Sequence, residues 1–190
     1  MVPLARRLQR CGYHVHLFGY PSVRRAPAQN ARRLQTFVQG LNAQVVHFVG
    51  HSLGGLVLLA LFHEFPDQPP GRVVLLGSPL AGSRSAARLM RLPWGRRMLG
   101  RSVERGLLGD GPRWEAPRDL GVIAGSVPLG VGLLLGAARQ AGDGAVGISE
   151  TRIAGIRDHL VAPASHTGLL LSPRVARQVC HFLRRGRFER

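Results

Sequence analysis

The chain has 190 residues, of which 45% are hydrophobic and 19% charged, so it is long and apolar enough for one folded domain and is not intrinsically disordered. The formal net charge is +16, and every basic residue is arginine. The arginines are scattered and only 6% of residues are aromatic, which argues against a specific nucleic-acid interface. We expect a solvated basic surface, with at most weak association with an anionic membrane surface.

The first half of the chain alternates between helical and strand patterns. Apolar residues at helical spacing predict helices over 3–10, 28–41 and 54–65. Alternating or continuous apolar runs predict strands over 13–18, 45–49 and 72–77. Because strands that alternate with helices form parallel β-α-β units, we expect an α/β fold with helices on both faces of a mostly parallel sheet.

The second half is less regular. Residues 80–118 contain no strand pattern, and we expect short helices over the strand ends or an ordinary surface excursion. We predict strands over 121–126 and 149–156, and a last helix that begins at Ser172-Pro173. The uncharged run 120–138 approaches membrane-spanning length, but its glycines and proline favour a buried strand, a loop and a short apolar helix.

Other sequence features bear on compartment and cofactors. The N-terminus shows no apolar secretory segment, so we expect a cytoplasmic protein. Cys11 and Cys180 lie far apart in apolar contexts, and we interpret them as buried reduced thiols, with a disulfide as the alternative. No metal-ligand spacing and no glycine-rich nucleotide motif occurs, so we expect neither a metal nor a cofactor.

The most informative stretch is Gly50-His51-Ser52-Leu53-Gly54, which lies between a predicted strand and a predicted helix. A sharp strand-to-helix turn exposes a serine hydroxyl for nucleophilic attack, and this spacing of glycines suits such a turn. The backbone N–H of Leu53 then faces the position of a developing oxyanion at the helix N-terminus. The alternative is a glycine-rich turn in which Ser52 only caps the helix.

The segment Val49–Leu56 resembles the nucleophile elbow of the α/β-hydrolase superfamily, in its lipase or esterase form. The tail segments 158–161 and 165–168 are similar to those of small bacterial lipase-like hydrolases. The resemblance implies a single domain over residues 1–190 with a helical cap inserted at 80–118. It also implies a serine hydrolase that cleaves carboxylic esters, small-molecule or lipid, through an acyl-enzyme on Ser52.

A serine hydrolase of this fold carries its nucleophile, acid and histidine in that chain order. His166, in a polar loop before the last helix, is the best candidate for the base, with His159 as the competitor. Asp143, in an Asp-Gly turn, is the best candidate for the acid, with Asp158 and Glu150 as alternatives. His51 lies inside the elbow, and we expect it to flank the substrate pocket.

The resemblance also implies a strand that ends in His-Gly before the first helix and gives a second oxyanion donor. The sequence from Met1 has no counterpart of it. We therefore expect weakened catalysis, because loss of one oxyanion donor costs roughly 10²–10³ in turnover. The alternatives are a crippled, hydrolase-like binding module, an acyltransferase or thioesterase of the same fold, and an anion-binding protein driven by its arginines.

Overall fold

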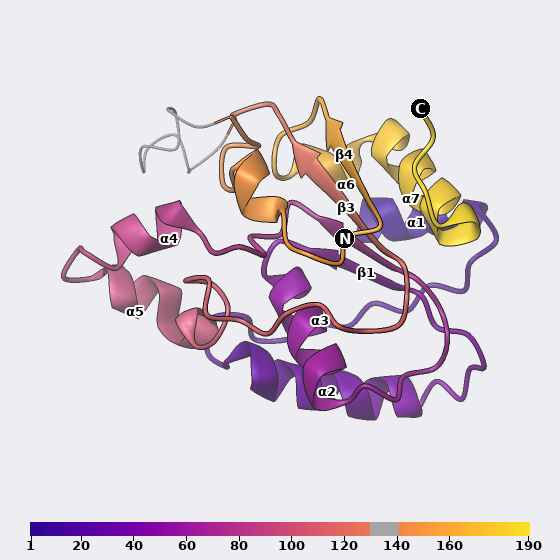
Figure 1. The fold of residues 1–190 in the computed structure, drawn as a ribbon, viewed down its shortest axis with the longest axis horizontal. Coiled ribbons are helices and arrows are strands. Elements are labelled where there is room, and N and C mark those ends of the chain that lie inside the picture. The colour runs from indigo at the N-terminus through magenta and orange to yellow at the C-terminus, as the bar shows by residue number, and fades with distance from the viewer. Residues whose placement is uncertain (130–140) are drawn as a thin grey trace.

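The computed structural model describes residues 1–129 and 141–190. Its centre is a parallel sheet of four strands in the order β1-β2-β3-β4 (Figure 1). The strands are β1 Phe48–His51, β2 Val73–Leu76, β3 Leu120–Gly125 and β4 Asp158–Ala162. The expected α/β class with a mostly parallel sheet is confirmed.

Helices cover both faces of the sheet, as expected (Figure 1). On one face lie α2 Pro27–Gln39 and α3 Leu53–Glu64, and on the other lie α1 Val2–Arg10, α6 Gly168–Leu171 and α7 Pro173–Arg185. Strand β2 shows why two layers form: Val73 and Leu75 pack towards α3, whereas Val74 and Leu76 pack towards α7. Successive side chains of a strand point to opposite faces, so an unbroken apolar strand needs cover on both.

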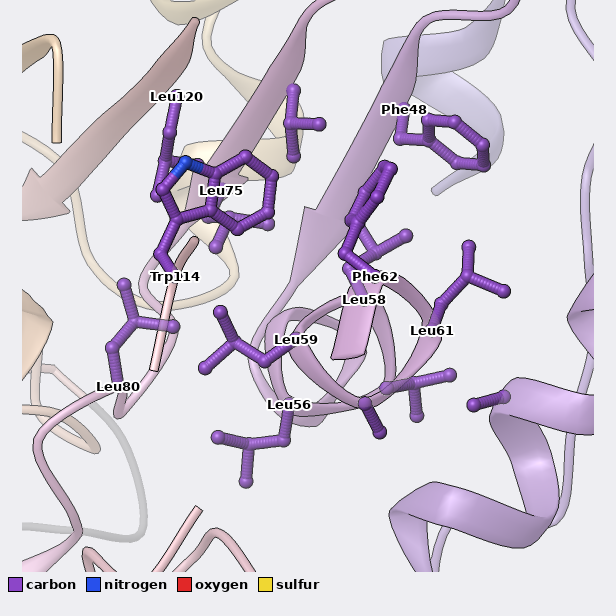
Figure 2. Close-up of a cluster of buried hydrophobic side chains, with 14 of the residues drawn as sticks. Phe48, Leu56, Leu58, Leu59, Leu61, Phe62, Leu75, Leu80, Trp114 and Leu120 are labelled. Carbon is purple, nitrogen blue, oxygen red and sulfur yellow. The ribbon is translucent and has the colours of Figure 1, made fainter. Parts of the chain in front are cut away.

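The layer around α3 holds most of the aromatic side chains of the core (Figure 2). The ring of Phe62 contacts Phe48 at 5.3 Å and Trp114 at 5.0 Å between centroids, both edge to face. Such pairs add about 0.5–1.5 kcal/mol to simple burial. This layer fixes α3, and with it the turn that joins β1 to α3.

Residues 80–118 form short helices and no strand within the described chain. They comprise α4 Arg84–Leu89, α5 Gly95–Leu99 and the 3₁₀ helix η1 Gly100–Val103, and Figure 1 shows α4 and α5 far from α1 and α7. Trp114 is buried in the core around α3, whereas Trp94 is half exposed. The two tryptophans of the segment therefore have different roles.

Two predicted strands are wrong. Residues 13–18 are irregular, because past Tyr13 no backbone hydrogen bond within the described chain ties the segment to a neighbouring strand. Residues 149–156 begin with the 3₁₀ helix η4 Ile148–Thr151, where Glu150 accepts from the Gly147 N–H at 3.0 Å. The last strand is β4, further along the chain, and as an edge strand it shows no clear alternation of burial.

The expectation of two free thiols is also wrong, because Cys11 and Cys180 form a disulfide. Helices α1 and α7 pack side by side, which brings the two Cα atoms to 6.4 Å across 169 residues of sequence. In the described part of the chain, no helix has the length and apolarity needed to cross a membrane. The predicted short apolar helix after β3 falls largely on residues 130–140, outside the described residues.

Candidate active site

Ser52 lies at the turn between β1 and α3, where its backbone has φ 55° and ψ −125°. A positive φ is strained for a residue with a side chain, at a cost of order 1–3 kcal/mol, and such strain clusters at functional sites. The Ser52 N–H donates to the carbonyl of Leu76 at 3.0 Å, so β2 holds the turn. Leu53 is the first residue of α3, where a backbone N–H has no partner within the helix.

The tight turn depends on glycines. A Cβ at Gly50 would lie 2.9 Å from a side-chain atom of Leu58, 3.0 Å from one of Leu75 and 3.1 Å from the backbone of Gly54, so these neighbours would have to move. At Gly54 a Cβ would meet only the Tyr20 hydroxyl, at an ordinary 3.5 Å, whereas at Gly55 it would collide with Ser78. The close approach of β1 to α3 thus favours glycine at 50, the packing of α3 against the loop after β2 requires Gly55, and the last glycine of the motif, Gly54, is not sterically required.

Asp143 and His166 are joined directly. His166 Nδ1 lies 2.8 Å from Asp143 Oδ2, and the His166 N–H donates to the Asp143 carbonyl at 2.9 Å. The other carboxylate oxygen accepts from the backbone N–H groups of Ala145 and Val146, at 2.9 and 2.8 Å. Asp143 is fully buried, and its carboxylate can only accept, so His166 carries its proton on Nδ1 and leaves Nε2 free to take one.

The His166 ring lies beside the serine turn, because it packs 4.5 Å from the ring of His51, the residue before Ser52. His51 Nε2 also donates to the His166 carbonyl at 3.0 Å. Burial, and then the charge on His166 when that residue is protonated, lowers the pKa of His51 to about 4. Among the hydrogen bonds of the described residues, none joins the Ser52 hydroxyl to His166. In hydrolases without substrate, the distance between nucleophile and base is often longer than a hydrogen bond.

The family model of the alpha/beta hydrolases matches residues 1–187. The chain belongs to the alpha/beta hydrolase family.

Solved structures agree with this fold. The metagenomic carboxyl esterase MGS0156 superposes on this alpha/beta hydrolase with a TM-score of 0.68 and 20% identity, over 91% of this chain and 65% of that one. The mature Bacillus licheniformis lipase BlEst2 superposes with a TM-score of 0.53 and 20% sequence identity, over 76% of this chain and 67% of the lipase chain. A lipase-esterase related protein from Clostridium acetobutylicum superposes with a TM-score of 0.58 and 9% sequence identity, over 95% of this chain and 87% of that chain.

The chain spans about two thirds of the mature BlEst2 and MGS0156 chains, and 36% of BlEst2 in its propeptide form. A search of curated proteins found no match. At these identities the likeness establishes the fold of this alpha/beta hydrolase and leaves its substrate to other arguments.

The alternative candidates for the acid and the base, Asp158, Glu150 and His159, make hydrogen bonds to groups outside the Asp143–His166 pair. Asp158 accepts from the Phe188 N–H and from Arg190, at the end of the sheet opposite Ser52. Glu150 accepts from the Arg84 N–H at 2.9 Å. His159 donates from Nε2 to the Thr151 hydroxyl at 2.8 Å, and burial lowers its pKa.

A cavity of about 210 Å³ opens beside Ser52 and Leu53. Its other walls come from the loop before α2, from the loop after β2, from the short helices and turn of residues 84–107, and from the loop after Asp143. The residues are Val23, Pro79, Ser83, Ser85, Ala86, Leu89, Met98, Leu99, Ser102, Leu107, Ala145 and Val146. Neither His51 nor His166 lines it. Contact between His51 and substrate stays a prediction.

Sequence reasoning missed one residue of this site, Gly77. It follows β2 with φ +51°, and a Cβ there would lie 2.7 Å from Asp143 Oδ2 and 3.2 Å from His166 Nδ1. The hydrogen-bonded pair therefore sits directly over this glycine. The only signal in the sequence was a glycine at the end of a predicted strand, which is common and uninformative by itself.

Proposed function

We propose that this alpha/beta hydrolase is a serine hydrolase that cleaves carboxylic esters, with Ser52 as nucleophile, His166 as base and Asp143 as acid. The observation that carries the proposal is the hydrogen bond of 2.8 Å between buried Asp143 and partly buried His166, beside a strained serine turn. A serine becomes a nucleophile when a base takes its proton, and a base needs a third group to orient it.

The reaction follows from these positions. His166 Nε2 takes the Ser52 proton as Oγ attacks the acyl carbon, and the same proton goes to the leaving alcohol as the ester bond breaks. Water, deprotonated by His166, then attacks the acyl-enzyme and releases the acid and Ser52. Asp143 stabilises the imidazolium that forms in each half, since its Oδ2 accepts from Nδ1.

Other groups assist in this proposal. The Leu53 N–H, at the positive end of α3, stabilises the oxyanion of each tetrahedral intermediate. His51 holds the His166 loop through its bond to the His166 carbonyl. The helices of residues 80–118 act as a cap over Ser52, because α4, α5 and η1 supply much of the cavity wall.

The test is hydrolysis of p-nitrophenyl esters by the wild type and by Ser52→Ala. The control is Ser172→Ala, which removes a hydroxyl that caps α7 by accepting from the Val175 N–H, and costs about 1 kcal/mol of stability. We expect Ser52→Ala to lose hydrolysis and Ser172→Ala to keep it. Hydrolysis that survives Ser52→Ala would refute the nucleophile, and turnover restricted to thioesters or alcohol acceptors would replace the ester-hydrolase assignment.

A further inference from the structure

The cavity beside Ser52 differs from the rest of the molecule in its chemistry. The chain carries 26 arginines, yet among the described residues that line this cavity none has a charged side chain. Leu89, Leu107 and Val146 are buried in its walls. Two of its hydroxyls are already bonded, since Ser83 accepts from the Ala86 N–H and Ser102 donates to the Leu99 carbonyl. The walls therefore suit an uncharged, apolar group.

The position of the cavity decides which half of an ester enters it. The cavity includes Ser52 and Leu53, where the acyl carbon and its oxyanion would lie, and it excludes His166. The base hands its proton to the leaving alcohol, so the alcohol must lie on the side of His166. The acyl chain must then extend from Ser52 on the side away from His166, and that side is this cavity.

The volume sets the length of that chain. A dry apolar cavity of about 150 Å³ takes a benzene-sized molecule of about six carbons. By the same ratio the 210 Å³ beside Ser52 holds an acyl chain of about eight carbons. We propose, on the basis of the proposed function, that the substrates are esters of uncharged short- to medium-chain acids, up to about eight carbons, whose acyl chain lies against Ala86 and Met98.

Substitutions of residues in the cavity wall test the proposal. Ala86 is buried in α4, and Ala86→Leu adds three carbons to the cavity wall. Met98 lies at a more open part of the wall, with 58% of its surface exposed, so Met98→Ala removes bulk at little risk to folding. Met90, at the end of α4, is absent from the lining, and Met90→Ala is the matched control.

The experiment measures kcat/KM for p-nitrophenyl esters from acetate to palmitate. For the wild type we expect about a fourfold rise for each methylene that enters the cavity, and no further rise beyond about eight carbons. Ala86→Leu should move that limit to shorter chains by about three carbons, Met98→Ala should move it to longer chains, and Met90→Ala should leave it unchanged.

The outcomes separate the two proposals. A wild type that hydrolyses no ester of any length would overturn the proposed function. An active wild type with a flat profile, or with a limit that neither Ala86→Leu nor Met98→Ala moves, would overturn the cavity assignment alone. A preference for charged acyl groups would overturn it too. Because Met98→Ala changes an exposed side chain, a failure of Ala86→Leu to fold still leaves the assignment testable.

Discussion

Gly77→Ala should lower both catalysis and stability. A methyl group at Gly77 would lie 2.7 Å from Asp143 Oδ2, whereas ordinary contacts begin at 3.4 Å, so the carboxylate or the backbone must move by 0.7 Å. Misplacement of a catalytic group by about 1 Å can cost roughly 10²-fold, and we expect kcat to fall by about that factor. The backbone at φ +51° adds strain of about 1 kcal/mol. The collision with buried Asp143 and with Leu169, whose Cδ1 would lie 2.9 Å away, adds about 1–3 kcal/mol, so the melting temperature falls by about 4–16 °C.

The matched control is Gly12→Ala. Gly12 also has a positive φ, +92°, but a Cβ there meets nothing within 4 Å, so this variant has the backbone strain without the collision. Ester hydrolysis and thermal unfolding of both variants are the assays. We expect Gly77→Ala to melt below Gly12→Ala, because only the former collides with buried groups, and to turn over esters far more slowly. If Gly77→Ala turned over esters as fast as Gly12→Ala, the argument that the Asp143–His166 pair must stay in place would be refuted.

Four further predictions follow from the same contacts. Asp143→Asn should lower kcat by roughly 10³–10⁴ with the fold intact by circular dichroism, because an amide facing Nδ1 favours the wrong tautomer of His166. His51→Phe keeps an aromatic ring but removes the donor to the His166 carbonyl, so kcat should fall about tenfold with KM unchanged. His51→Gln, which can donate to that carbonyl, should restore kcat, and equal kcat values for His51→Phe and the wild type would contradict a positioning role. Urea unfolding of the wild type should show stability falling as the pH drops from 6.5 towards 4. The unfolded state, with the higher His51 pKa, takes up the proton first, so His51 contributes up to ~3 kcal/mol to this fall, and His47 and His159, whose pKa values burial also lowers, add to it. His51→Gln should flatten the curve, and an unchanged slope in that variant would disprove the contribution of His51. Reduction of the Cys11–Cys180 bond, which closes a loop of 169 residues, should lower the free energy of unfolding by about 5 kcal/mol, and identical unfolding with and without dithiothreitol would show that the bond is not formed.

The sequence predicted the helices, the central strands and the serine turn well, because each depends on local patterns. The apolar runs at β1 and β2 are continuous, and Ser172 and Pro173 mark the start of α7 by local chemistry. The 13–18 segment was mispredicted because alternation shows only that a segment could be a strand, whereas a strand also needs a backbone partner. That partner is a property of the whole fold.

In the candidate site, too, local features could be predicted from the sequence, whereas contacts between distant segments could not. The order of Ser52, Asp143 and His166 and their loops were readable in the sequence, and the structure brings the latter two into contact. The disulfide was not readable, because it depends on the packing of α1 against α7. Gly77 and the bond from His51 to the His166 carbonyl were likewise hidden, since both depend on atoms far apart in the chain.

The most direct test of the central claim is covalent labelling of the folded wild-type protein with a fluorophosphonate, read by peptide mass spectrometry. Such a probe reacts with a serine only where a base activates it. We predict a single adduct on Ser52 that disappears in Ser52→Ala and is strongly reduced in Asp143→Asn. A folded protein that takes no adduct, or takes it on another serine, would contradict the assignment of Ser52 as an activated nucleophile.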